Sequence, residues 1–253
     1  MKTFLDIDYT GLNDPKRLLD IYLPEGECRA TVMWLHGGGL EHGDRKGCEG
    51  IAAQLCGNGI AYVSVEYRMY PECTYPDFIN DSAAAAAWLV KYAKKYGLSE
   101  KIYIGGSSAG AYLSMMLCFA RKYFERVSLI PEHFAGYIFD AGQPTTHFNV
   151  LKYRGEDSRL CRIDEAAALY HIVSARPARP LKFIYSEFDM PARPEQNRLM
   201  IATLKHMGYN MDLVDEQFMP GFTHCGYRNT LDENGRYVLA NIIEAFVDKY
   251  YEA

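Results

Sequence analysis

Short apolar runs alternate with longer segments of mixed polarity along the whole chain. The apolar runs are rich in β-branched and aromatic residues and are bounded by Gly, Pro or Asp, which is typical of buried parallel strands. We predict such strands at residues 30–35, 60–65, 102–104, 135–139 and 181–185. The longer segments between them predict helices at residues 47–56, 76–96, 109–124, 164–173 and 194–207. This alternation predicts a mostly parallel sheet with helices on both faces.

The two ends of the chain add further elements. Residues 3–9 and 17–23 alternate in polarity around a Gly- and Pro-containing turn, which predicts a hairpin at one edge of the sheet. Residues 211–218 predict a last strand, and residues 231–250 predict a closing helix with an apolar face. We therefore expect an α/β protein with about eight strands, folded as one domain over residues 1–253.

Composition and charge exclude several classes of protein. The formal net charge is -5 and no long basic run is present, so we expect no nucleic-acid partner. Acidic residues at the N-terminus argue against a signal peptide, and no apolar window reaches the roughly 20 residues of a membrane span, so we expect a cytoplasmic protein with no membrane contact. The seven cysteines form no CxxC pair, which favours free, mostly buried thiols over disulfides or a metal site.

The segment Gly106-Ser107-Ser108-Ala109-Gly110 lies between a predicted strand and a predicted helix. A sharp strand-to-helix turn needs small residues two positions on either side of its central serine, and Gly106 and Gly110 supply them. Such a turn exposes the hydroxyl above the sheet, so we predict Ser108 as a nucleophile. Ser107 lacks this flanking pattern and is predicted to be a turn residue.

A glycine-rich loop follows the strand at residues 30–35. His36-Gly37-Gly38-Gly39 would expose backbone N–H groups at the carboxyl end of that strand, where open α/β sheets place their sites. We predict that Gly38 and Gly39, together with the amide of Ala109, form an oxyanion hole. The loop lacks the GxGxxG and P-loop patterns, which disfavours nucleotide binding. His36 is expected to order the loop, and His42 and Asp44 to brace it.

Two further strand-end loops carry the remaining groups of a catalytic triad. Glu187 and Asp189 follow the strand at 181–185, and we predict that Asp189, which lies farther from the strand, is the acid. His224 follows the last predicted strand and is the predicted base. The chain order Ser108, Asp189, His224 is the order expected on this type of sheet. His224 would take the Ser108 proton while Asp189 orients its ring, and this chemistry requires no metal or organic cofactor.

At these motifs the chain resembles the α/β-hydrolase superfamily, and within it the hormone-sensitive-lipase-like and small bacterial carboxylesterases of acetyl esterase type. The resemblance rests on four motifs: His36–Gly39, Glu66-Tyr67-Arg68-Met69-Tyr70-Pro71-Glu72, Gly106–Gly110 and Glu187–Asp189. It implies the α/β-hydrolase fold and hydrolysis of carboxylic esters through an acyl-enzyme. Ser107 departs from the family, which usually has an acidic residue there.

The resemblance also bears on substrates. A lid insertion is expected at about residues 143–178, and its small size favours short-acyl or sugar-linked esters, including acetylated carbohydrates, over long lipids. Tyr70, Tyr112 and Phe222 are candidates for substrate contact, with core packing as the alternative role for each. The expected partner is a small-molecule ester, and homo-oligomer formation is left open.

Two other functions remain open at the level of sequence. Formamidases related to kynurenine formamidase, and peptidase-like amide hydrolases, resemble this chain in size and motif. A non-catalytic binding protein on the same scaffold is the alternative from another class, because a fold does not determine a function. Such proteins usually lack a triad member, whereas Ser108, Asp189 and His224 are all present.

Overall fold

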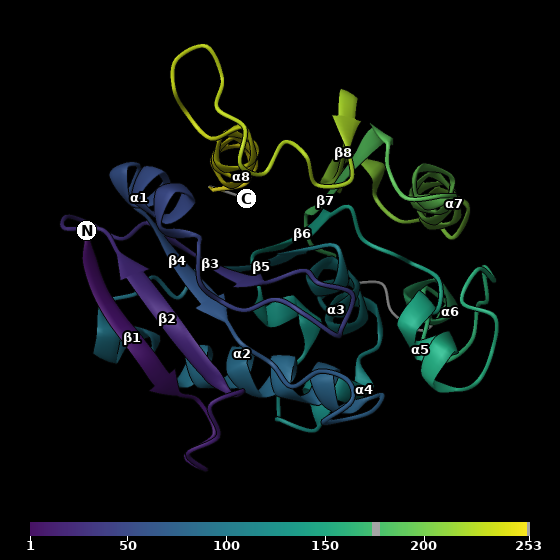
Figure 1. Ribbon diagram of the computed structural model, residues 1–253. Helices are drawn as coiled ribbons and strands as arrows, with labels where there is room; N and C mark the ends of the chain where they lie inside the picture. Colours follow the sequence, from purple (N-terminus) through teal and green to yellow (C-terminus); the bar gives the residue numbers. More distant parts are fainter. Residues whose placement is uncertain (174–177, 252–253) are drawn as a thin grey trace.

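Eight strands form one sheet in the computed structural model, which describes residues 1–173 and 178–251 (Figure 1). The spatial order is β1-β2-β4-β3-β5-β6-β7-β8. The strands are β1 (Lys2–Asp8), β2 (Leu18–Leu23), β3 (Ala30–Leu35), β4 (Ile60–Val65), β5 (Ile102–Ser107), β6 (Gly136–Asp140), β7 (Leu181–Phe188) and β8 (Val214–Thr223). Strand β2 pairs antiparallel with β1 and β4, and all other pairs are parallel. The predicted fold class and edge hairpin are confirmed.

Helices cover both faces of the sheet (Figure 1). They are α1 (Glu49–Gly57), α2 (Asp77–Tyr96), α3 (Ala109–Phe119), α4 (Lys122–Glu125), α5 (Phe148–Tyr153), α6 (Ala168–His171), α7 (Arg193–His206) and α8 (Val238–Lys249). Helices α2, α3 and α7 share one hydrophobic cluster with the sheet, and α1 and α8 share the other. Helix α3 is buried along its whole length, which agrees with its nearly uniform apolar sequence.

Several predicted boundaries were wrong for local reasons. The closing helix begins at Val238 rather than at residue 231, because Asp232 accepts hydrogen bonds from the backbone amides of Asn234 and Arg236 and so forms a turn. The last strand begins at Val214, after a short 3-10 helix that Asn210 caps. The helix predicted at 109–124 is interrupted at Ala120.

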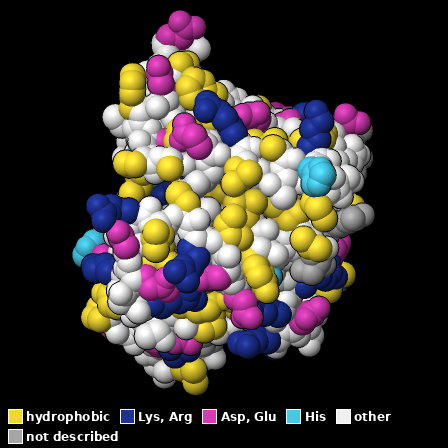
Figure 2. Space-filling model, turned by 90° about the vertical axis from the view of Figure 1, so that its right-hand side faces the viewer, with side chains coloured by type: hydrophobic (Ala, Val, Ile, Leu, Met, Phe, Trp, Pro, Cys, Tyr) yellow, Lys and Arg dark blue, Asp and Glu magenta, His cyan; other side chains and the backbone are white. Residues whose placement is uncertain are grey.

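The chain between β6 and β7 carries α5 and α6 and occupies the position of the expected lid. Residues 174–177 of that expected insertion lie outside the described residues. Several side chains of this segment are large, apolar and exposed: Tyr153, Leu160, Ile163 and Tyr170. Figure 2 shows the molecule from the side of α5, α6 and α7. Hydrophobic side chains on this face lie among both acidic and basic ones, so the face does not carry charge of a single sign.

Two further expectations concern cysteines and membrane spans. All seven cysteines are free thiols, and four of them are buried. Within the two described ranges, no helix combines the length and apolar character that crossing a bilayer requires.

The first turn of α3 packs unusually close to the end of β3. A Cβ atom on Gly110 would lie 1.9 Å from the carbonyl oxygen of Leu35. A Cβ atom on Gly106 would lie 2.6 Å from the same oxygen and 2.5 Å from the backbone of Gly110. Both glycines are therefore required by steric contact, as the sequence pattern predicted.

We predict that Gly110→Ala lowers the free energy of unfolding by about 3 kcal/mol or more, because the added methyl group displaces backbone rather than a flexible side chain. Urea unfolding followed by circular dichroism measures this change. Gly57→Ala in α1 is the matched control, since nothing lies within 4 Å of its added Cβ atom, and we expect it to be neutral or slightly stabilising. Equal unfolding midpoints for wild type and Gly110→Ala would contradict the prediction.

Candidate active site

Ser108 lies at the junction of β5 and α3 in a conformation that L-residues rarely adopt, with φ 54° and ψ -110°. Its amide donates a 2.7 Å hydrogen bond to the carbonyl oxygen of Asp140 at the end of β6. Strain of this kind persists only where the surroundings hold it, and it is typical of functional sites. The turn leaves Ser108 partly exposed, whereas its neighbours Ser107 and Ala109 are buried.

His224 joins the predicted nucleophile to the predicted acid. Its Nε2 atom lies 2.8 Å from Oγ of Ser108, and its Nδ1 atom lies 2.5 Å from Oδ1 of Asp189. The Asp189 side chain is fully buried, and His224 retains a quarter of its exposure. The structure thus brings together three residues from loops that are far apart in sequence.

The environment of Asp189 favours its charged form. Burial alone would raise its pKa, but the hydrogen bond from His224 and the nearby charges of His224 and Arg193 lower the pKa below the ordinary value. The backbone amide of Met190 also donates to Oδ1 at 2.7 Å. A carboxylate held in this way can orient the imidazole ring and stabilise its protonated form.

Glu187, the competing acid, has a different partner. Its side chain is exposed and accepts a 2.8 Å hydrogen bond from the backbone amide of Gly221, beside an irregular pairing of β7 and β8. Its carboxylate therefore fastens the end of β8, whereas Asp189 contacts the histidine.

The glycine loop lies directly beside Ser108. A Cβ atom on Gly37 would be 3.4 Å from Cβ of Ser108, and Gly38 and Gly39 adopt positive φ values of 113° and 68°. Gly38 and Gly39 line the same cavity as Ser108, and Ala109 provides the first amide of α3. Backbone donors at such positions suit an oxyanion hole, which is the role predicted for these three residues.

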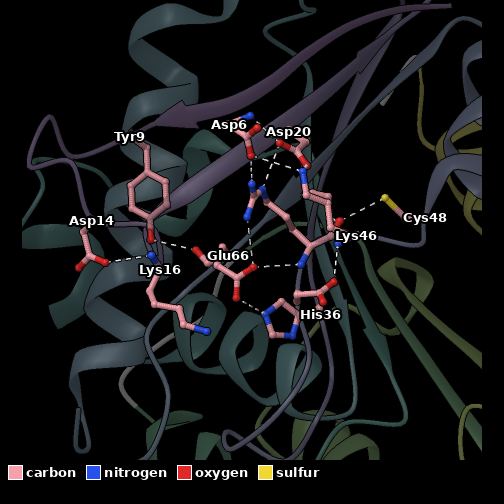
Figure 3. A network of polar contacts seen from close by, with 12 residues as sticks. Asp6, Tyr9, Asp14, Lys16, Asp20, His36, Lys46, Cys48 and Glu66 are labelled. Carbon is pink, nitrogen blue, oxygen red and sulfur yellow. Dashed lines mark hydrogen bonds and ion pairs between the residues drawn. The ribbon is translucent and has the colours of Figure 1, made fainter. Parts of the chain in front are cut away.

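A buried polar network supports this loop from behind (Figure 3). Nδ1 of His36 lies 2.7 Å from the carbonyl oxygen of Gly37, and its ring stacks on Tyr67. Its Nε2 atom lies 3.4 Å from Glu66, which also accepts from the backbone amide of Arg45. His36 therefore contacts the loop that it was expected to order. Sequence identified Glu66 only as part of a motif, and neither its contact with His36 nor the role of Arg45 was expected.

Two residues expected to brace the loop lie on its open side. His42 and Asp44 are both exposed and line the cavity. The amide of His42 donates to the carbonyl oxygen of Gly38, and Asp44 accepts from the amide of Lys46. Both residues thus stabilise turns of the loop, while their side chains face the cavity.

Asp140 is a second acid at the site, and sequence reasoning missed it. It is fully buried at the end of β6, where Oδ2 accepts a 2.5 Å hydrogen bond from Ser107 and Oδ1 accepts from the hydroxyl of Tyr227. Burial raises the pKa of its carboxyl group. Its position just after a predicted strand, next to the nucleophile strand, was a signal that could have identified it.

The Ser108 cavity has a volume of about 660 Å³. Beyond the glycine loop and the triad, its wall includes Phe148, Asn149, Met190 and Arg228. A second cavity of about 270 Å³ adjoins it, and Phe148 and Met190 line both. These two side chains therefore separate the cavities.

The three aromatic residues proposed for substrate contact do not line the Ser108 cavity, so this prediction was wrong. Tyr112 is fully buried and donates to the carbonyl oxygen of Ala166 in the lid segment. Tyr70 is buried and stacks on Tyr153 at 3.7 Å between ring centroids. Phe222 packs edge-on against Tyr227. All three take the packing role, because sequence cannot tell which face of an element an aromatic ring meets.

The sheet order and the strained serine turn define the class of protein by its architecture: the chain has the α/β-hydrolase fold. The family model described as BD-FAE matches residues 19–138. "Lipase 2" of Moraxella sp. (strain TA144) is 38% identical over 93 residues, or 35% of this chain and 21% of that protein. "Acetyl esterase" of Salmonella enteritidis PT4 (strain P125109) is 32% identical over 97 residues, or 38% of this chain and 30% of that protein. The matched segments thus span less than a third of these relatives.

Solved structures share the fold over nearly the whole chain. A "truncated form of carbohydrate esterase from gut microbiota" superposes with a TM-score of 0.76 at 17% identity, covering 98% of this chain and 97% of its own. "Esterase B" from Lactobacillus Rhamnosis (HN001) gives a TM-score of 0.79 at 17% identity, with 99% of this chain and 86% of its own covered. These comparisons support the fold assignment.

We predict that Asp189→Asn slows labelling of Ser108 by a fluorophosphonate about 1000-fold or more, because the amide favours the wrong tautomer of His224. Gel-based labelling kinetics measure this rate. Glu187→Gln is the matched control and is expected to label within about threefold of wild type, since Glu187 accepts its hydrogen bond from the β8 backbone rather than from His224. A large loss in Glu187→Gln with none in Asp189→Asn would reverse the assignment of the acid.

Proposed function

We propose that this protein is a serine esterase that hydrolyses short-acyl esters through Ser108, His224 and Asp189. The observation that carries the proposal is the pair of contacts made by His224, 2.8 Å to Ser108 and 2.5 Å to Asp189, at a turn that already holds the serine in a strained conformation. An unreactive scaffold has no need to maintain such strain beside an oriented base.

The chemistry follows from these positions. Oγ of Ser108 attacks the ester carbonyl carbon while His224 takes the hydroxyl proton. The carbonyl oxygen gains negative charge, and the amides of Gly38, Gly39 and Ala109 donate to it. His224 then protonates the leaving alcohol, so the C–O bond breaks and an acyl-Ser108 remains. A water molecule that gives its proton to His224 hydrolyses the acyl-enzyme, and the triad supplies every proton transfer.

The size of the site supports a short acyl group. Phe148 packs against the oxyanion loop, since a Cβ atom on Gly39 would lie 3.4 Å from its ring. Together with Met190 it closes the Ser108 cavity toward the second cavity. A long acyl chain would have to displace these side chains.

The polarity of the cavity supports a hydrophilic alcohol. Besides Phe148 and Met190, polar and charged residues line it: Glu41, His42, Asp44, Lys46 and Arg228. Hydroxyl-rich alcohols such as sugars present donors and acceptors that suit such a lining. An acetyl esterase among the similar sequences and a carbohydrate esterase among the similar structures agree with this substrate class.

We predict that Ser108→Ala abolishes hydrolysis of p-nitrophenyl acetate and butyrate, lowering kcat by about 10⁴-fold or more, because it removes the hydroxyl that contacts His224 and would take the acyl group from the ester. Release of p-nitrophenol measures the rate. Ser107→Ala is the matched control, and it is expected to retain fluorophosphonate labelling because its hydroxyl is bound to Asp140. Undiminished turnover by Ser108→Ala would refute the proposal.

We further predict that Phe148→Ala shifts the preferred acyl length upward. Removing the ring joins the two cavities, so kcat/KM for p-nitrophenyl octanoate relative to acetate should rise about tenfold. The measurement is a chain-length series from acetate to octanoate. Tyr170→Ala, an exposed lid aromatic that lines neither cavity, is expected to leave the profile unchanged. An unchanged profile in Phe148→Ala would show that another residue sets the limit.

A further inference from the structure

Arg228 is a cation in the wall of the Ser108 cavity that forms no ion pair in the described part of the chain. Among the described residues, no carboxylate oxygen lies within the 4.0 Å that defines an ion pair with its guanidinium. Its Nε atom is buried and makes no hydrogen bond within that part of the chain. The residue as a whole is partly exposed, so the rest of the guanidinium can reach a ligand in the cavity. A buried N–H group without a partner is destabilising, and a bound anion would supply the missing acceptor.

Two other charged groups at the cavity are already matched. Lys46 lies 2.8 Å from Asp20, and Glu41 lies 2.7 Å from Lys152. Asp44 is exposed and accepts a hydrogen bond from the backbone of Lys46. Arg228 is therefore the cation of this wall that remains available to bind an anion.

Asp140 is the buried acid of this site, and Arg228 acts on it through space: the charge of Arg228 opposes the rise that burial causes in the pKa of Asp140. Its two carboxylate oxygens accept from Ser107 and Tyr227, and it forms no ion pair with Arg228 in the described structure. The hydroxyl partners satisfy Asp140 without the guanidinium.

The position of Arg228 indicates whether it would contact the acyl half or the alcohol half of a bound ester. It follows His224 by four residues, and its amide donates to the carbonyl oxygen of Cys225, so it belongs to the same turn as the base. His224 protonates the leaving oxygen, and the alcohol therefore departs on the side of this turn. Phe148 and Met190 lie in another part of the wall, next to the second cavity.

We propose that Arg228 binds a carboxylate on the alcohol half of the substrate, so that the preferred substrates are short-acyl esters of hydroxy acids. The proposal rests on the esterase function proposed above. A guanidinium recognises a carboxylate through two parallel hydrogen bonds, which neutral hydroxyl groups cannot reproduce. Binding of the carboxylate would neutralise the charge of Arg228 and would orient the ester bond toward Ser108.

The test compares paired aryl acetates that differ only in charge. 3-Acetoxybenzoate and 4-acetoxybenzoate carry a carboxylate on the leaving phenol, and the corresponding acetoxybenzamides are neutral and of similar size. The ratio of kcat/KM for the anionic and neutral members is expected to fall at least about tenfold in Arg228→Gln, the loss typical of one charged hydrogen-bonded contact. Arg228→Lys keeps the charge and should retain part of the preference. Added NaCl should weaken the preference in wild type but not in Arg228→Gln.

Arg126→Gln is the matched control, because it removes an exposed positive charge on the far side of the sheet, where Arg126 contacts Asn80. It should leave the ratio unchanged. Should Arg228→Gln fail to fold, competitive inhibition of wild type by 3-hydroxybenzoate and 3-hydroxybenzamide gives the same comparison, with the anion expected to bind more tightly.

Equal loss of both substrates in Arg228→Gln, or equal inhibition by the two phenols, would overturn the proposal while leaving the esterase function intact. Failure of wild type to hydrolyse even the neutral acetates would instead refute the proposed function itself.

Discussion

The contact between the first turn of α3 and the last residue of β3 is the constraint on which the site depends. The backbones meet so closely at Gly110 and Leu35 that no side chain fits between them. This contact holds Ser108 next to Gly37, and hence places the nucleophile beside the loop that offers amides to the oxygen of an ester. A looser junction would separate the attacking atom from the groups that stabilise its product, and reactivity falls steeply with such displacements.

The glycine loop is as conformationally demanding as the serine turn, and the two are supported differently. Helix packing holds the turn, whereas buried charges hold the loop, with Arg45, Glu66 and Asp20 almost wholly withdrawn from water. Buried ion pairs contribute little net stability, because desolvation opposes their attraction. These ion pairs nevertheless depend on the direction of their hydrogen bonds, and removing one partner leaves the other as an uncompensated buried charge. A rigid loop is a more plausible result of this arrangement than a more stable fold.

The sequence predicted the strands better than the helix ends, because buried strands leave strong local patterns. The residues predicted as a triad from the glycine-flanked serine and the chain order do contact one another, whereas the predicted pocket residues do not line the cavity. The roles of Tyr70, Tyr112 and Phe222 depend on which neighbour each ring meets, which is a tertiary property. Arg228 was missed for a related reason: an unmatched charge is recognisable only when all surrounding carboxylates have been placed.

Asp140 shows why the nucleophile motif alone describes this site incompletely. Parallel pairing of β5 and β6 places Asp140 directly opposite Ser107 in register. Its carboxyl group therefore reaches the nucleophile turn from the adjacent strand, and it also accepts from the hydroxyl of Tyr227, beyond the histidine. The polar groups behind the nucleophile thus come from two strands that are distant in sequence, and a search for sites of this kind should follow sheet register as well as the linear spacing of residues.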